Sequence, residues 1–150
     1  MLRRTKPSPC ALREPRWTPL SARRLPGVWP SLHAWLSDRG SLTGSVIASC
    51  RGRFRVELVL QGRAAALPSE AGLLDGGPAQ ATLVREVKLY CGRNAMVFAR
   101  TLIPLGSLRG PVHALTQLGQ RPLGEVLFAD PTTRRLRVEV ARITDRKSVV

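Results

Sequence analysis

The segment Thr82–Pro104, TLVREVKLYCGRNAMVFARTLIP, constrains the fold of this chain more than any other. It consists of two stretches in which apolar and polar side chains alternate, and a short turn with glycine and asparagine separates them. Alternation with a period of two is typical of half-buried β-strands, because successive side chains point to opposite faces. The segment therefore predicts a β-hairpin.

Each stretch carries one arginine on its apolar side. Arg85 lies among aliphatic residues in the first stretch, and Arg100 shares its side of the second stretch with Met96, Phe98 and Leu102. An unpaired guanidinium removed from water is unfavourable, so an inward arginine needs an anionic or hydrogen-bonding partner. Two interpretations stay open for each arginine: a structural position at the sheet margin or beside a carboxylate, and a pocket for a small anion. The presence of both arginines in one hairpin favours the anion pocket.

The net charge of +14 suggests a nucleic acid or an anionic surface as a partner. Residues 1–24 contribute +6 of this charge in a Pro-rich segment, and the rest is spread without a long basic run. The sequence has neither zinc-finger spacing nor a basic motif interleaved with aromatic residues. Nucleic-acid binding is therefore disfavoured. It would predict binding that falls steeply with salt and is mostly lost when residues 1–24 are removed.

The three cysteines, Cys10, Cys50 and Cys91, are widely spaced and odd in number. No signal-peptide core precedes them, and no apolar run approaches the roughly 18 residues of a membrane span. We therefore expect reduced cysteines in a cytoplasmic protein. His33 and His113 have no neighbours at ligand-like or triad-like spacing, so no metal site is predicted.

The organisation of the chain predicts a disordered basic leader over residues 1–27 and one domain over residues 28–150. Helices are expected over Pro30–Leu36, from Ser41 to about Cys50, over Gly110–Gly119 and from Pro122; strands over Phe54–Gln61 and Leu136–Ile143; and a loop or lid over Gly62–Ala81. The inward positions are expected to be Leu42, Val46 and Ile47 on the second helix, and Phe54, Val56, Leu58 and Leu60 on the first strand. Without regular βαβ alternation, this order favours an α+β domain on an antiparallel sheet.

Two predicted helix starts are candidate anion sites. The first turn of a helix leaves backbone N–H groups without intrahelical partners, and the macrodipole makes that end electropositive. Ser41–Thr43 and Pro122–Gly124 stand at such positions, and Leu123 supplies the first free donor of its turn because proline has no N–H. A helix start that faces Arg85 would form a carboxylate site from a charged fork and backbone donors.

Four stretches carry motifs that recur together: WLSDRGSLT (Trp35–Thr43), LVREVKLYCG (Leu83–Gly92), FARTLIP (Phe98–Pro104) and LRGPVHALTQLGQRPLGEVLF (Leu108–Phe128). In order and spacing they resemble the chorismate lyase family, also called chorismate–pyruvate lyase, over about Val28 to Arg142. The combination of RTLIP with LGxRPLGxxLF is the most specific part of this resemblance.

The resemblance implies an enzyme that removes pyruvate from chorismate and leaves 4-hydroxybenzoate, the first committed ring precursor of ubiquinone. It implies a single α+β domain, with a mainly antiparallel sheet, helices on one face and helical flaps over a buried site. The reaction aromatises the ring, so it needs neither a cofactor nor a metal. The protein positions the dianion, excludes water and stabilises charge on the departing enolpyruvate. We expect a monomer.

The resemblance also assigns site residues. Arg85 matches the arginine that binds the ring carboxylate, Leu123 a residue with a backbone contact, and Leu42 a hydrophobic residue that lines the pocket. Arg100 matches an arginine of the family's RTxxP motif and is assigned to the site region. Family members continue into a final strand with a glutamate that hydrogen-bonds the product's ring hydroxyl, whereas this sequence stops at RKSVV. We therefore expect a domain without its final strand, and we assign no catalytic residue. The alternative function is a catalytically impaired domain of the same fold that binds an aromatic carboxylate, and pyruvate release distinguishes the two.

Overall fold

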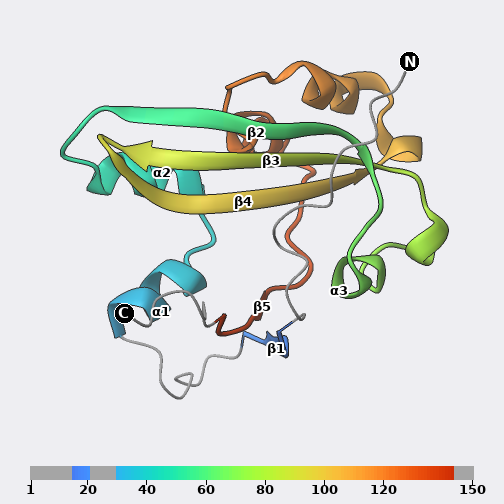
Figure 1. The fold of residues 1–150 in the computed structure, drawn as a ribbon, viewed down its shortest axis with the longest axis horizontal. Coiled ribbons are helices and arrows are strands. Elements are labelled where there is room, and N and C mark those ends of the chain that lie inside the picture. Colours follow the sequence, from blue (N-terminus) through green and yellow to red (C-terminus); the bar gives the residue numbers. More distant parts are fainter. Residues whose placement is uncertain (1–14, 21–29, 144–150) are drawn as a thin grey trace, which may run out of the picture. The chain divides into compact units, whose positions relative to one another are not determined.

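The structure is a computed structural model that describes residues 15–20 and 30–143 (Figure 1). The chain forms two compact units: residues 1–39 together with 134–150, and residues 40–133. Most of the predicted leader lies outside the described residues, and its disorder stays a prediction.

The larger unit is built on an antiparallel sheet, which in the described part of the chain has the strand order β2-β3-β4 (Figure 1). These strands are β2 (Phe54–Ala64), β3 (Thr82–Cys91) and β4 (Asn94–Pro104). β3 and β4 form the predicted hairpin, and Gly92 in its turn has φ 58°, a conformation that glycine adopts without strain. The predicted α+β class with an antiparallel sheet is confirmed.

Short helical segments fill the connections of this unit. The α-helices are α2 (Leu42–Ser49), α3 (Pro68–Ala71) and α4 (Leu123–Ala129), and the 3-10 helices are η1 (Gly77–Ala79), η2 (Leu105–Ser107) and η3 (Gly110–Gln117). The helix predicted from Gly110 is present as the 3-10 helix η3. The loop predicted over Gly62–Ala81 begins with the last residues of β2 and contains the short helices α3 and η1. Pro122 is the N-cap of α4, which begins where the sequence predicted.

The register of β3 and β4 separates the two arginines. Arg85 pairs with Thr101, whereas Glu86 pairs with Arg100. Because neighbouring residues of a strand point to opposite faces, Arg85 and Arg100 lie on opposite faces of the sheet. The prediction that both arginines contribute to one anion pocket is therefore wrong.

Helical segments cover the sheet face that carries Arg85, which we call the helical face. Its apolar core has two clusters: Val46 of α2 with Val56 and Leu89, and Leu83 and Ile103 with Leu115 and Leu118. Leu123 of α4 packs against the second cluster. On α2, only Val46 is buried, whereas Leu42 is 45% exposed and Ile47 49% exposed. The predicted burial of Leu42 and Ile47 is therefore wrong, because this short helix buries a narrow stripe.

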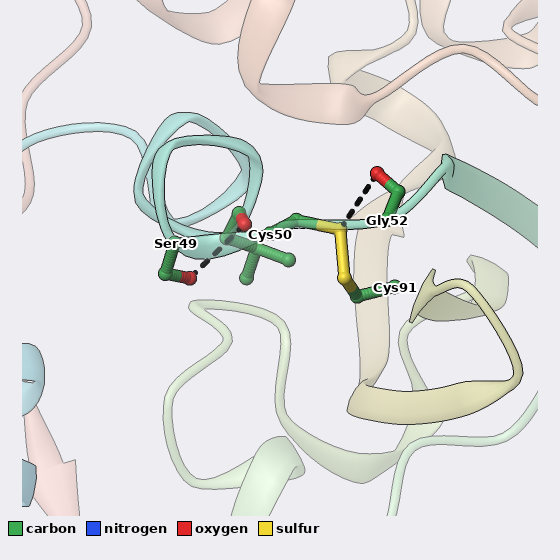
Figure 2. Close-up of a disulfide and its surroundings, with 5 residues drawn as sticks. Ser49, Cys50, Gly52 and Cys91 are labelled. Carbon is green, nitrogen blue, oxygen red and sulfur yellow. Dashed lines mark hydrogen bonds between the residues drawn. A yellow bond between two sulfur atoms is a disulfide. The ribbon is translucent and has the colours of Figure 1, made fainter.

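Cys50 and Cys91 form a disulfide (Figure 2). Cys50 is the C-cap of α2 and Cys91 is the last residue of β3, so the bond ties the helix to the turn end of the hairpin. The contact between Val46 and Leu89 holds α2 on the strand and brings the two cysteines together. The prediction of reduced cysteines is wrong for this pair, and Cys10 lies outside the described residues.

The smaller unit contains α1 (Pro30–Ser37) and a two-stranded antiparallel ribbon of β1 (Thr18–Pro19) and β5 (Glu139–Val140). α1 agrees with the predicted helix, and β1 lies within the segment predicted as a leader. The predicted strand Leu136–Ile143 is too long, since the strand β5 contains only Glu139 and Val140 and Leu136 is 93% exposed. Across both units, the described residues form no helix with the length and apolar character that crossing a membrane requires.

Candidate anion-binding site

Arg85 is the largest fully buried side chain in the described part of the chain, with 2% of its surface exposed. Its Nη1 donates hydrogen bonds to Oε1 of Gln61 (3.0 Å) and to the carbonyl oxygen of Gly119 (2.7 Å). Its Nη2 donates to the carbonyl oxygen of Arg121 (2.9 Å). All three acceptors are uncharged. No carboxylate among the described residues forms an ion pair with this guanidinium.

The charge of Arg85 is therefore buried but not neutralised by the described residues. Desolvation by burial lowers the pKa of Arg85, yet an arginine side chain stays protonated at neutral pH. A guanidinium has five N–H donors, and the three hydrogen bonds use both hydrogens of Nη1 and one of Nη2. The Nε–H and the second Nη2–H have no partner among the described residues. They suit the two oxygens of a carboxylate ligand.

Arg100 has a different environment on the opposite face. Its Nε lies 2.8 Å from Oε1 of Glu70, its Nη1 lies 2.6 Å from Oε1 of Glu86, and its Nη2 donates to the carbonyl oxygen of Ala65 (3.3 Å). Burial opposes the charge, but hydrogen bonds with Glu70 and Glu86 outweigh it and raise the pKa of Arg100. Two carboxylates thus occupy Arg100 and tie α3 to the sheet. Its position on the face opposite Arg85 does not agree with its assignment to the site region.

The start of α4 adjoins Arg85, and the start of α2 adjoins the start of α4. Arg121, whose carbonyl oxygen accepts a hydrogen bond from Arg85, lies two residues before α4. In the first turn of α4, a Cβ added to Gly124 would lie 3.0 Å from Oγ of Ser41, the N-cap of α2. These contacts place the guanidinium and the two helix starts in one region. Sequence analysis raised a helix start beside Arg85 as a hypothesis, and in the structure the start of α4 lies there.

Leu123, predicted to make a backbone contact, and Leu42, predicted to line the pocket, are the first residues of these helices. Leu123 packs against the core cluster around Leu83, and its backbone N–H lies in a turn where intrahelical acceptors are absent. Leu42 leaves 45% of its surface exposed beside Ser41. The binding roles of both residues stay predictions, and the geometry is compatible with them.

Sequence reasoning missed Gln61. Alternation along the strand predicts Leu60 on the helical face, but the pairing of β2 with β3 shifts between Leu58 and Leu60. This β-bulge places Leu60 opposite Glu86, on the other face, and places Gln61 opposite Arg85. The only trace of Gln61 in the sequence is that a polar residue stands where the apolar alternation of the strand stops. This pattern does not indicate on which face of the sheet the side chain lies.

Comparisons with known proteins show the family of this chain. The profile of the chorismate lyase family matches residues 12–149 and so begins within the segment predicted as a leader. A Methylococcus capsulatus protein named "Probable chorismate pyruvate-lyase" is 41% identical over 115 residues, which cover 77% of this chain and 71% of that protein. A protein of the same name from Thiobacillus denitrificans is 43% identical, over 77% of this chain and 62% of its own length. Another from Pseudomonas aeruginosa is 40% identical, over 82% of this chain and 69% of its own length. The chain belongs to the chorismate lyase family.

Proposed function

We propose that this protein removes pyruvate from chorismate and releases 4-hydroxybenzoate, with Arg85 as the residue that binds the ring carboxylate. Family membership supports the reaction. The observation that carries the site is the buried guanidinium, which has neutral acceptors and no carboxylate partner among the described residues. A role of the product as a ubiquinone precursor, a cytoplasmic location and a monomeric state belong to the same proposal and rest on the family resemblance.

In this proposal, the ring carboxylate accepts hydrogen bonds from the Nε–H and the second Nη2–H of Arg85. The backbone N–H of Leu123 supplies a further donor from the start of α4. A hydrogen bond to a charged group contributes about 1.5–3 kcal/mol, which makes the arginine the main source of affinity. Leu42 and Leu123 contribute apolar surface that limits access of water to the ring.

The reaction breaks the ether bond between the ring and the enolpyruvyl group. The ring carbon that bears the hydroxyl loses its hydrogen as a proton, and the electron pair of that C–H bond enters the ring, which becomes aromatic. The departing enolpyruvate takes up a proton at its methylene carbon and becomes pyruvate. Because aromatisation supplies the driving force, binding and orientation of the dianion are the contributions that these residues make. The proposal assigns no catalytic acid or base.

Pyruvate release from chorismate, coupled to lactate dehydrogenase, tests the proposal directly. The purified chain is expected to release pyruvate faster than chorismate decays without protein. A folded protein that binds 4-hydroxybenzoate but releases no pyruvate would support the alternative of an impaired aromatic-carboxylate-binding domain. A folded protein that does neither would refute the proposal.

A further inference from the structure

We propose that Gln61 is a positioning residue, which holds the guanidinium of Arg85 in the orientation that binds an aromatic carboxylate. This inference rests on the proposed function. Gln61 belongs to β2, the neighbour of the strand that carries Arg85, and the bulge after Leu58 turns it onto the helical face. Without that extra residue, regular pairing would place Gln61 on the opposite face.

Both ends of the Gln61 amide are engaged. Its Oε1 accepts the hydrogen bond from Nη1 of Arg85 (3.0 Å), and its Nε2 donates to the carbonyl oxygen of Thr116 in η3 (2.6 Å). A guanidinium only donates and a carbonyl only accepts, so one orientation of the amide satisfies both contacts. Gln61 therefore has a fixed position and connects β2, β3 and η3.

The other two acceptors of Arg85 are less firmly placed than Gln61. Gly119 and Arg121 belong to the segment between η3 and α4, and Gly119 has φ 54°, a conformation typical of turns. Gln61 stands on a strand that pairs with β3 on both sides of the bulge, and Gln61 itself is paired with Arg85. Groups on regular strands are held more accurately than groups on loops. Gln61 is thus the acceptor that fixes the plane of the guanidinium relative to the sheet.

The chemical type of Gln61 also suits this role. Arg100, in the same sheet, is held differently from Arg85: the carboxylates of Glu70 and Glu86 bind its guanidinium and balance its charge. A neutral amide orients a guanidinium and leaves its charge for a ligand. Gln61 therefore supplies orientation, whereas Arg85 supplies the charge.

The substitution Gln61→Met tests this inference, because methionine keeps the length of the side chain and removes both hydrogen bonds. Gln80→Met is the matched control, since the Gln80 amide accepts only a local contact from the backbone N–H of Gly76 (3.4 Å). We expect Gln61→Met to raise the Kd of 4-hydroxybenzoate and the KM of chorismate about tenfold, with kcat within about twofold of wild type. Gln80→Met is expected to leave all three unchanged. A purely structural role would lower stability without this separation of KM from kcat.

A folded Gln61→Met protein with wild-type Kd and KM would overturn the inference. If the variant does not fold, nitrogen-15 NMR of wild type decides, with the Arg85 signals assigned by comparison with Arg85→Lys. A guanidinium held by Gln61 gives nuclear Overhauser contacts between the Arg85 Nη1 hydrogens and the Gln61 side chain. Slow rotation alone does not decide, because Gly119 and Arg121 also bind the guanidinium, and the absence of these contacts would overturn the inference. A wild-type chain that neither binds 4-hydroxybenzoate nor releases pyruvate would refute the proposed function, and this inference with it.

Discussion

Replacement of Arg85 by lysine is the substitution that most sharply separates binding from folding. Lysine keeps a positive charge but loses the planar fork, so it cannot donate to the three present acceptors and to a carboxylate at the same time. Arg85→Ala is less informative, because it would leave Gln61 Oε1 and the carbonyl oxygens of Gly119 and Arg121 without their donor. The structure thus shows that Arg85 also supports the fold.

The magnitudes follow from the contacts. If the ammonium keeps one of the three hydrogen bonds, two bonds of a charged group are lost at about 1.5–3 kcal/mol each, and the free energy of unfolding falls by about 3–6 kcal/mol. A typical domain has a stability of about 5–15 kcal/mol, so Arg85→Lys is expected to stay folded at 25 °C. Loss of one charge-assisted hydrogen bond to the ligand, about 1.5–3 kcal/mol, raises the Kd of 4-hydroxybenzoate about 10- to 150-fold.

Isothermal titration calorimetry with 4-hydroxybenzoate measures the Kd, and urea unfolding measures the stability. Arg55→Lys is the matched control, because Arg55 is an exposed residue that pairs with Glu57 (3.1 Å) and covers the ring of Tyr90. Exposed pairs contribute about 0–1 kcal/mol, so this control is expected to change neither quantity by much. A folded Arg85→Lys protein whose Kd lies within about threefold of wild type would refute the role of Arg85 as the carboxylate anchor.

Three further substitutions test the packing around the site. Arg100→Met leaves the buried Glu86 and the partly buried Glu70 without their cation, so urea unfolding is expected to show a loss of about 3 kcal/mol in the free energy of unfolding. A loss below about 1 kcal/mol would contradict the stabilising role of these ion pairs. Reduction of the Cys50–Cys91 disulfide, which spans 41 residues, is expected to lower the free energy of unfolding of the wild type by about 3–4 kcal/mol. The same reductant is expected to leave the stability of Cys50→Ser unchanged. Equal responses of the two proteins would show that the disulfide does not stabilise the fold. Gly124→Ala is expected to destabilise because its Cβ would meet Ser41 Oγ at 3.0 Å, and a double-mutant cycle with Ser41→Ala is expected to show a coupling of about 1 kcal/mol. If the two losses of stability were strictly additive, the starts of α2 and α4 would not be in contact.

The sequence was most informative where one local pattern decides the structure. Alternation over Thr82–Pro104 predicted the hairpin, because each stretch has a polar side and an apolar side. Ser41 and Pro122 predicted the starts of α2 and α4, because an N-cap oxygen and a proline favour those positions chemically. The Ser41 oxygen indeed accepts a hydrogen bond from the backbone N–H of Gly44 (3.2 Å).

Features that depend on register or on distant contacts were not predictable. A shift of one residue moves a side chain to the other face, and nothing local indicates that the bulge follows Leu58. Gln61 therefore remained hidden. Arg85 and Arg100 look equivalent along the sequence, and only strand pairing reveals that one has neutral acceptors and the other two carboxylates.

We propose above all that the buried charge of Arg85 binds the ring carboxylate beside the start of α4. A crystal structure of the chain with 4-hydroxybenzoate tests it most directly. We expect carboxylate oxygens at about 3 Å from Nε and Nη2 of Arg85 and from the backbone nitrogen of Leu123, with Gln61 still bonded to Nη1. A carboxylate bound elsewhere, with the Arg85 guanidinium making no contact to the product, would contradict it.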